Sequence, residues 1–286
     1  MSIPHVAFCD GGLCNRLNAL IFALILRRRF GGAWRLAWPV NNWCGAPFER
    51  LFSADGLTVD AVPLADFKAQ EQAYTRIVHE NQCAFGPEGL YFQSALHTYD
   101  DYAGLFALGK PVFYYHNLIP PCADLGDIQL ALQSVQIQPA IAERARAFCR
   151  EQGIDGSVLG LHIRKTDFGN AVDDQGLFKL VSESPNRFFV CSDDAEVNAR
   201  FAALPNCAVF PKQSFPEKLV GEGGWNAQTI DNQGRVFGFN ITRSEAALVD
   251  ALIDLLILSR TTHVNTSHST FLRMAMIFKA TGYFAA

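Results

Sequence analysis

The sequence predicts an α/β fold built from two Rossmann-like domains that face each other across a cleft. Three observations predict it. The chain opens with an apolar run, a glycine turn and a helix-period stretch, which is the start of a βαβ unit. Strands and helices alternate again in the second half, and the pair Pro120-Pro121 interrupts the pattern between the halves. We place the domains at residues 1–135 and 136–286.

In the first half, a strand is predicted over Ile3–Phe8, followed by a glycine turn and a helix over Leu13–Phe30. A second strand over Ala33–Trp38 completes the βαβ unit, and parallel strands of this kind carry their ligand loops at their carboxyl ends. Residues 41–111 give only weak patterns, rich in aromatic side chains. Pro111–His116 predicts a further buried strand.

In the second half the alternation is clear. Pro139 suits the first turn of a helix that runs to Gln152. The later elements are predicted as strands Ser157–Ile163, Arg187–Ser192, Cys207–Phe210 and Thr262–Thr266, and helices Ala195–Leu204, Arg243–Ser259 and Thr270–Ala280.

Composition excludes several classes of protein. The formal net charge of −4 and pI near 6.0 leave no positive surplus for a nucleic-acid partner. The apolar run Leu17–Leu26 is about half of the roughly 20 residues that span a bilayer, so we expect no transmembrane segment, while peripheral membrane contact stays open.

The basic cluster Arg27–Arg29 follows this apolar run, whereas in a signal peptide the basic residues come before it, and we expect a cytoplasmic protein. The eight cysteines form no CxxC or Cys/His set, which predicts reduced thiols and no metal site.

Polar loops follow three of the predicted strands. In His162-Ile163-Arg164 the alternation of a strand puts His162 and Arg164 on one face. A guanidinium there suits a pyrophosphate, because it offers paired donors and a fixed charge that stabilises a diphosphate leaving group without a metal. The alternative is a structural ion pair between Arg164 and Asp167.

The loop Thr266-Ser267-His268-Ser269 precedes a helix, where free backbone N–H groups and the helix dipole favour phosphate. Simple N-capping by Ser267 or Ser269 is the alternative.

The first loop, Asp10-Gly11-Gly12, lacks the patterns of dinucleotide and P-loop sites, so neither NAD nor ATP is indicated. Its glycines permit close approach of a substrate that Asn15 and Arg16 could reach, and a plain tight turn is the alternative.

Ser192-Asp193-Asp194 follows another predicted strand. The acidic pair is better suited to accept hydrogen bonds from a base or ribose than to bind a metal. The alternative is that Ser192 or Asp193 caps the next helix.

Four motifs together resemble the superfamily of GDP-fucose fucosyltransferases that includes the bacterial nodulation enzymes, the core α1,6-fucosyltransferases and the protein O-fucosyltransferases. Gly12–Leu17 is similar to its glycine-asparagine start, and His162–Asp167 to its HxRRxD box, with Lys165 in place of the second arginine. Phe189–Asp194 is similar to its strand ending in two aspartates, and Leu255–Phe271 to its last helix, strand and serine loop.

The resemblance implies a GT-B fold and metal-independent, inverting transfer from GDP-fucose or a related GDP-sugar to a glycan or oligosaccharide acceptor, with no cofactor. It implies that the first domain serves the acceptor and the second the donor. The resemblance implies that Arg164 contacts the donor pyrophosphate, that His162 and either Asp193 or Asp194 contact the guanosine, and that Ser267–Ser269 contact the phosphates. It also implies that Asn15 lies near the reacting sugar. The remaining residues of the implied site are Gly12, Arg16, Lys165 and Thr266. Lys165 keeps the charge of the arginine and loses its paired donors.

Inverting transfer to a hydroxyl usually uses a general base. The family tends to place an acidic residue a few positions after the box, which makes Asp173 or Asp174 the candidate here and Asp10 the rival. Asp173 is our choice, and the alternative is that these aspartates only cap a helix near Leu177. Two other functions stay open: transfer of a different nucleotide-linked sugar, and nucleotide-sugar binding without catalysis.

Overall fold

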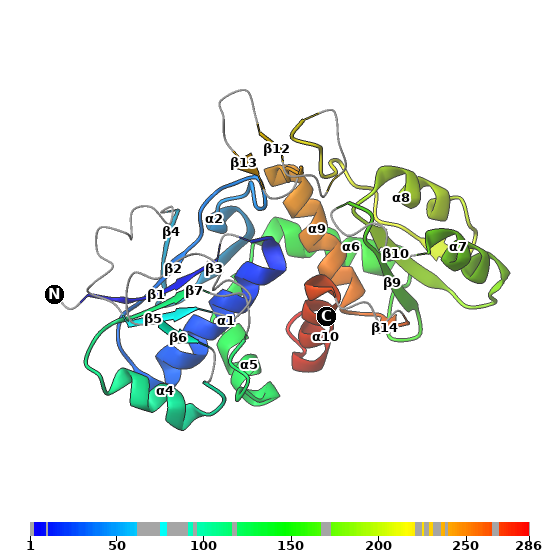
Figure 1. The fold of residues 1–286 in the computed structure, drawn as a ribbon. Coiled ribbons are helices and arrows are strands. Elements are labelled where there is room, and N and C mark those ends of the chain that lie inside the picture. The colour runs from blue at the N-terminus through cyan, green and yellow to red at the C-terminus, as the bar shows by residue number, and fades with distance from the viewer. Residues whose placement is uncertain are drawn as a thin grey trace. The chain divides into compact units, whose positions relative to one another are not determined.

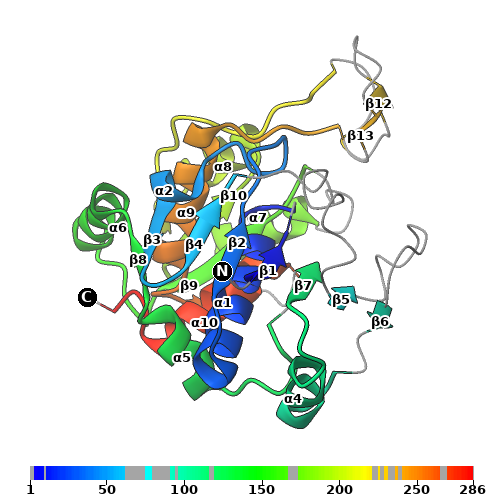
Figure 2. The same ribbon diagram turned by 90° about the vertical axis from the view of Figure 1, so that its left-hand side faces the viewer.

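The structure, a computed structural model, divides by residue contacts into two compact units (Figures 1 and 2). Unit 1 comprises residues 1–41 and 47–136, and unit 2 comprises residues 42–46 and 137–286. The described residues are 3–9, 11–61, 75–78, 91–93, 96–115, 119–166, 173–220, 225, 229–230, 236–237, 240–264 and 269–285.

Unit 1 is built on a parallel sheet of six strands in the order β4-β2-β1-β7-β5-β6. The predicted βαβ opening is confirmed, because β1 pairs in parallel with β2. The strands are β1 (His5–Phe8), β2 (Trp34–Ala37), β4 (Thr58–Asp60), β5 (Thr75–Val78), β6 (Tyr91–Gln93) and β7 (Val112–Tyr115). β3 (Phe52–Ala54) pairs separately with β8 (Val135–Ile137).

Helix α1 (Leu13–Phe30) is the central helix of unit 1. It begins after Gly12 and ends at Gly31, whose φ of 73° is readily adopted only by glycine. The basic residues of its last turn complement the negative end of the helix dipole. The ring of Phe22 stacks on Tyr114 of β7, so apolar burial fixes the helix on the sheet. The other helices in the described part of the unit are α2 (Phe48–Leu51), α4 (Tyr99–Phe106) and α5 (Leu125–Leu132).

Unit 2 contains a second parallel sheet, in the order β11-β10-β9-β14. Its strands are β9 (Leu159–Ile163), β10 (Phe188–Ser192), β11 (Cys207–Ala208) and β14 (Thr262–His263). Its helices are α6 (Pro139–Glu151), α7 (Asp174–Glu183), α8 (Ala195–Ala202), α9 (Glu245–Leu258) and α10 (Thr270–Thr281), and β12 (Thr229–Ile230) and β13 (Val236–Phe237) form an antiparallel pair.

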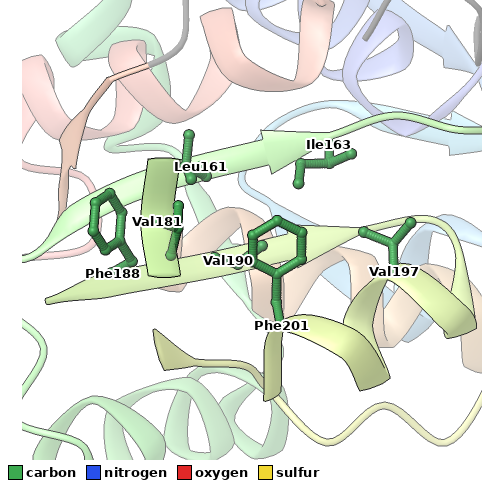
Figure 3. Packing of buried hydrophobic residues seen from close by; sticks show 7 residues of the cluster. All are labelled: Leu161, Ile163, Val181, Phe188, Val190, Val197 and Phe201. Atoms are coloured by element: carbon green, nitrogen blue, oxygen red, sulfur yellow. The ribbon is translucent and has the colours of Figure 1, made fainter. Parts of the chain in front are cut away.

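Alternation along β9 and β10 separates the two faces of this sheet. Leu161 and Ile163 point with Val190 into an apolar cluster that α7 and α8 complete through Val181, Val197 and Phe201 (Figure 3). His162, between Leu161 and Ile163, therefore belongs to the other face. That face meets α10, because the imidazole of His162 stacks on the ring of Phe271.

Most predicted elements agree with the structure, within a few residues at their ends. The weakly patterned stretch 41–111 contains short strands and helices of unit 1, and residues 42–46 pair instead with unit 2, where Gly45 forms a parallel bridge with Ser244. The seven cysteines in the described part are free thiols. No helix in the described ranges has the length and apolar character of a membrane span.

Candidate functional site

The end of β9 brings His162 and Arg164 to the carboxyl edge of the unit 2 sheet. His162 is only 7% exposed, and its ring centroid lies 4.6 Å from that of Phe271. Burial, followed by the positive charges of Arg164 and Lys212, lowers the pKa of His162 to about 3. The imidazole is therefore neutral at physiological pH. Arg164, just beyond the strand, is partly exposed, as a ligand contact requires.

Asp193 joins the end of β10 to the loop that follows Arg164. Its Oδ1 accepts a hydrogen bond from the Lys165 amide at 2.7 Å, and its Oδ2 accepts one from the Thr166 hydroxyl at 2.5 Å. Asp194 instead caps α8, accepting from the Val197 amide at 2.9 Å. The expectation that Ser192 or Asp193 would be this cap is wrong, because Ser192 is still in the strand and the helix begins at residue 195.

A buried ion pair lies beneath these strand ends. Lys212 contacts Asp254 Oδ2 at 2.5 Å, and both side chains are almost fully buried, with 7% and 3% of their surface exposed. The same ammonium donates to the carbonyl of Ser192 at 2.5 Å. Asp254 Oδ1 is buried and has no hydrogen-bond partner among the described residues.

Sequence reasoning missed this pair, although a signal was present. Asp250 and Asp254 interrupt the apolar helix α9 four residues apart, so both carboxylates lie on one side of a helix that is otherwise apolar on most faces. Asp250 is also buried and accepts hydrogen bonds from the amides of Gln213 and Ser214. Charged residues inside such a run predict buried partners.

At the start of α10, Ser269 is the N-cap and accepts from the amide of Phe271 at 3.2 Å. The predicted capping by Ser269 is thus observed, and capping leaves other N–H groups of the first turn for an anion. Thr266, Ser267 and His268 lie outside the described residues, as does Asp167, the predicted ion-pair partner of Arg164.

In unit 1, Arg16 is fully buried. Its guanidinium donates to the carbonyls of Gly11 at 2.7 Å and Pro39 at 2.5 Å, and to Asn41 Oδ1 at 2.9 Å. It also lies 5.3 Å from the ring centroid of Trp38. Arg16 therefore fastens the loop after β1 to the loop after β2, a use that its position in the sequence did not predict.

Asn15 and Gly12 lie at the start of α1. Gly12 is the N-cap residue and has open space where a side chain would stand. A Cβ on Gly11 would come within 2.8 Å of Asn15 Nδ2, so the glycine makes room for the asparagine. Asn15 Oδ1 is buried and has no hydrogen-bond partner in the described part of the chain.

Asp173 is the N-cap of α7, where its exposed carboxylate accepts a hydrogen bond from the Gly176 amide at 2.9 Å. The capping alternative is therefore observed for Asp173, and it leaves the role of a base untested. Asp10 and the side chain of Asp174 are outside the described residues. Within the described ranges, no three His, Cys, Asp or Glu side chains gather as a metal-ligand set.

The fold of the chain is shared with solved fucosyltransferases. One neighbour is fucosyltransferase NodZ from Bradyrhizobium, with 16% identity, a TM-score of 0.56, and coverage of 96% of this chain and 93% of that one. Another is NodZ alpha-1,6-fucosyltransferase soaked with GDP-fucose, with 17% identity, a TM-score of 0.52, and coverage of 97% and 92%. A third, co-crystallized with GDP, has 18% identity and a TM-score of 0.51, with 96% and 92% covered.

These neighbours confirm at the level of the fold the resemblance that the four motifs predicted. No protein-family model and no curated protein matches the sequence.

Proposed function

We propose that the protein is an inverting, metal-independent GT-B glycosyltransferase that moves fucose from GDP-fucose to a hydroxyl group of a glycan. The observation that carries this proposal is the likeness to NodZ along 96% of the chain, combined with a neutral histidine and an arginine at the end of β9. Fold alone does not define chemistry, so the strand-end residues supply the mechanism.

Arg164 is proposed to bind the donor pyrophosphate. As the bond from the sugar C1 to the phosphate oxygen breaks, negative charge grows on the leaving diphosphate, and a guanidinium can accommodate it with paired hydrogen bonds. The start of α10 is proposed to add N–H donors and the hydroxyls of Ser267 and Ser269. Thr266, His268 and Lys165 stay predicted contacts of the same phosphates.

The guanosine is proposed to lie against His162 and the aspartates of β10. Asp193 and Asp194 already accept hydrogen bonds within the protein, but each carboxylate has further lone pairs for a ribose or base. Asp254 Oδ1 is a buried acceptor without a partner among the described residues. Guanine differs from adenine, cytosine and uracil in presenting two adjacent donors, N1–H and the N2 amino group, which one carboxylate can accept together.

The acceptor hydroxyl is proposed to attack C1 from the face opposite the leaving diphosphate, which inverts the configuration. A new C1–O bond forms, the bond to GDP breaks with its electron pair, and the hydroxyl proton passes to a base. Asp173 is the proposed base, and Asn15 is proposed to lie near the reacting sugar. A positioned base contributes roughly 10² to 10⁴ in rate.

The first test is a thermal-shift panel of GDP, UDP, ADP and CMP. A nucleotide at about 100 times its Kd stabilises the folded state by roughly 2.7 kcal/mol, and GDP is expected to give the largest shift. A larger shift with UDP or ADP would reject the donor assignment. Slow hydrolysis of GDP-fucose without an acceptor then separates an enzyme from a binding protein, because a silent binder releases no GDP from it.

A further inference from the structure

Lys212 is a buried cation at the site edge of the unit 2 sheet. It follows β11, which runs parallel to β10, so the segment containing Lys212 leaves the sheet at the same edge as Ser192. Its ammonium is held between Asp254 Oδ2 of α9 and the carbonyl of Ser192, each at 2.5 Å. The side chain thus connects the ends of two strands to a helix.

The segment does not need Lys212 as its anchor. The next two residues, Gln213 and Ser214, donate their backbone amides to Asp250 at 2.5 and 3.1 Å, and Asp250 is also paired with Arg144. A buried ion pair is seldom more stabilising than apolar side chains of similar volume. Lys212 therefore contributes mainly by holding one particular geometry at the end of β10.

That geometry extends to the loop carrying Arg164. Ser192, whose carbonyl binds Lys212, is followed by Asp193, and Asp193 accepts hydrogen bonds from the Lys165 amide and the Thr166 hydroxyl. Asn198 also binds the backbone of Ser192. Its Oδ1 accepts a hydrogen bond from the Ser192 amide at 3.0 Å, and its Nδ2 donates one to the Ser192 carbonyl at 3.2 Å. A shift of the Ser192 carbonyl would move Asp193 and with it the loop next to Arg164.

We propose that Lys212 is a positioning residue for the transfer reaction: by fixing the Ser192 carbonyl, it holds Asp193 where Asp193 supports the backbone beside Arg164. The proposal rests on the function proposed above. The charge of Lys212 has a second effect on the same site, since together with burial and Arg164 it keeps His162 neutral.

The experiment compares Lys212→Met with a matched control, Lys279→Met. Lys279 also donates to a backbone carbonyl of unit 2, that of Thr261 at 2.6 Å, but at the amino end of β14, the opposite edge of the sheet. Amide hydrogen exchange at Lys165 and steady-state turnover of GDP-fucose are measured for both. Removing Lys212 leaves the buried Asp254 carboxylate unpaired, which lowers stability generally, so the amides of β9 serve as an internal reference. For Lys212→Met we expect exchange at Lys165 to accelerate at least about tenfold more than exchange at these reference amides. We also expect kcat to be about tenfold lower with KM within about threefold, because a displaced Arg164 is felt in the transition state.

Lys212→Arg keeps the charge and the donors, and it is expected to restore the protection of Lys165 and most of kcat. If Lys212→Met does not fold, Lys212→Gln replaces it, because the glutamine side chain is one bond shorter than lysine and carries no charge to pair with Asp254. Parental exchange at Lys165 in the folded variant, or equal acceleration in Lys279→Met, would overturn the proposal. Faster exchange in Lys212→Met, with no GDP-fucose turnover by the parent protein, would keep the structural link and reject the transfer function.

Discussion

The first turn of α1 in unit 1 and the loop after β9 in unit 2 each contain an arginine, and the two arginines differ in their surroundings. Arg16 is completely buried, and its donors are directed to Gly11, Pro39 and Asn41 of its own unit. Arg164 lies partly exposed beyond its strand, and the loop beside it is held by the carboxylate of Asp193. The loop after β1 is held by a cation, whereas the loop after β9 is held by an anion.

The difference shows what a charged residue at a strand end can be used for. An arginine that is surrounded by backbone carbonyls cannot turn to a ligand without leaving those carbonyls unpaired, which is costly in a buried place. In the loop after β9, the carboxylate of Asp193 holds the backbone at Lys165 instead. The contacts of Arg16 are therefore structural, whereas ligand binding by Arg164 stays the proposal made above, and five experiments can break or sharpen this comparison.

The largest effect is expected for Arg164→Lys. A point charge cannot replace paired hydrogen bonds to phosphate oxygens, so kcat should fall between about 100-fold and 1,000-fold while the fold stays intact. Steady-state kinetics with GDP-fucose and circular dichroism measure the two properties. Arg150→Lys, at an exposed arginine of α6, is the control. Turnover within about twofold of the parent would show that Arg164 is not the phosphate ligand.

Asp173→Asn distinguishes two roles of Asp173, the observed N-cap of α7 and the proposed general base. Asparagine also caps helices, so the variant should keep the hydrogen bond to Gly176 and the melting temperature. If Asp173 takes the acceptor proton, turnover falls about 100-fold, and the acidic limb of the pH–rate profile is lost while GDP affinity is unchanged. Asp174→Asn and Asp10→Asn are measured beside it. Parental turnover in all three would place the base elsewhere or show that none is used.

Arg16→Lys tests the other side of the comparison. An ammonium cannot reach three acceptors arranged around a guanidinium, so the free energy of unfolding should fall by about 2–3 kcal/mol. Urea denaturation measures this, with Arg28→Lys, at an exposed arginine of α1, as the control. GDP affinity of the folded variant should be unchanged. An unaltered stability with more than about tenfold weaker GDP binding would instead support the donor contact that the sequence predicted for Arg16.

His162 predicts a dependence of stability on pH. Its pKa is about 3 in the folded protein and about 6.5 when unfolded, so the unfolded chain binds a proton first as the pH falls. The stabilisation is complete above the unfolded pKa and is lost as the pH falls toward 3. Between about pH 7 and pH 5 the loss should be about 2 kcal/mol. His162→Gln should remove this component, and His97→Gln, at an exposed histidine, should not. An unchanged pH dependence in His162→Gln would show that His162 titrates normally.

The smallest effect is expected from chelation. The carboxylates of Asp193 and Asp194 are used in hydrogen bonds within unit 2, and the positive charge for the leaving diphosphate is proposed to come from Arg164 and α10. Excess EDTA should therefore leave the initial rate of transfer unchanged. A rate that falls on chelation and returns with Mn²⁺ or Mg²⁺ would reopen the acidic pair as a metal site.

The sequence by itself determined the order of elements and the location of the candidate site. Apolar periods of two and 3.6 residues predicted β1, α1 and β2, and in the second half β9, β10, β11, β14, α6, α8, α9 and α10, because burial of one face is a local property of the pattern. The motif at His162 and Arg164 was located at a strand end for the same reason. Residues 41–111 gave only weak apolar patterns, and the strands described there pair with partners such as β2, β7 and β8, which no local pattern specifies.

Only the tertiary structure decided how each charged side chain is used. Arg16 and Arg164 both follow a parallel strand, and no local pattern shows that carbonyls from residues 11 and 39 would surround the first. Lys212 meets Asp254 and the carbonyl of Ser192 across 42 and 20 positions of sequence. Because burial and ion pairing arise from residues distant in the chain, they set the charge and freedom of a site residue only once the chain has folded.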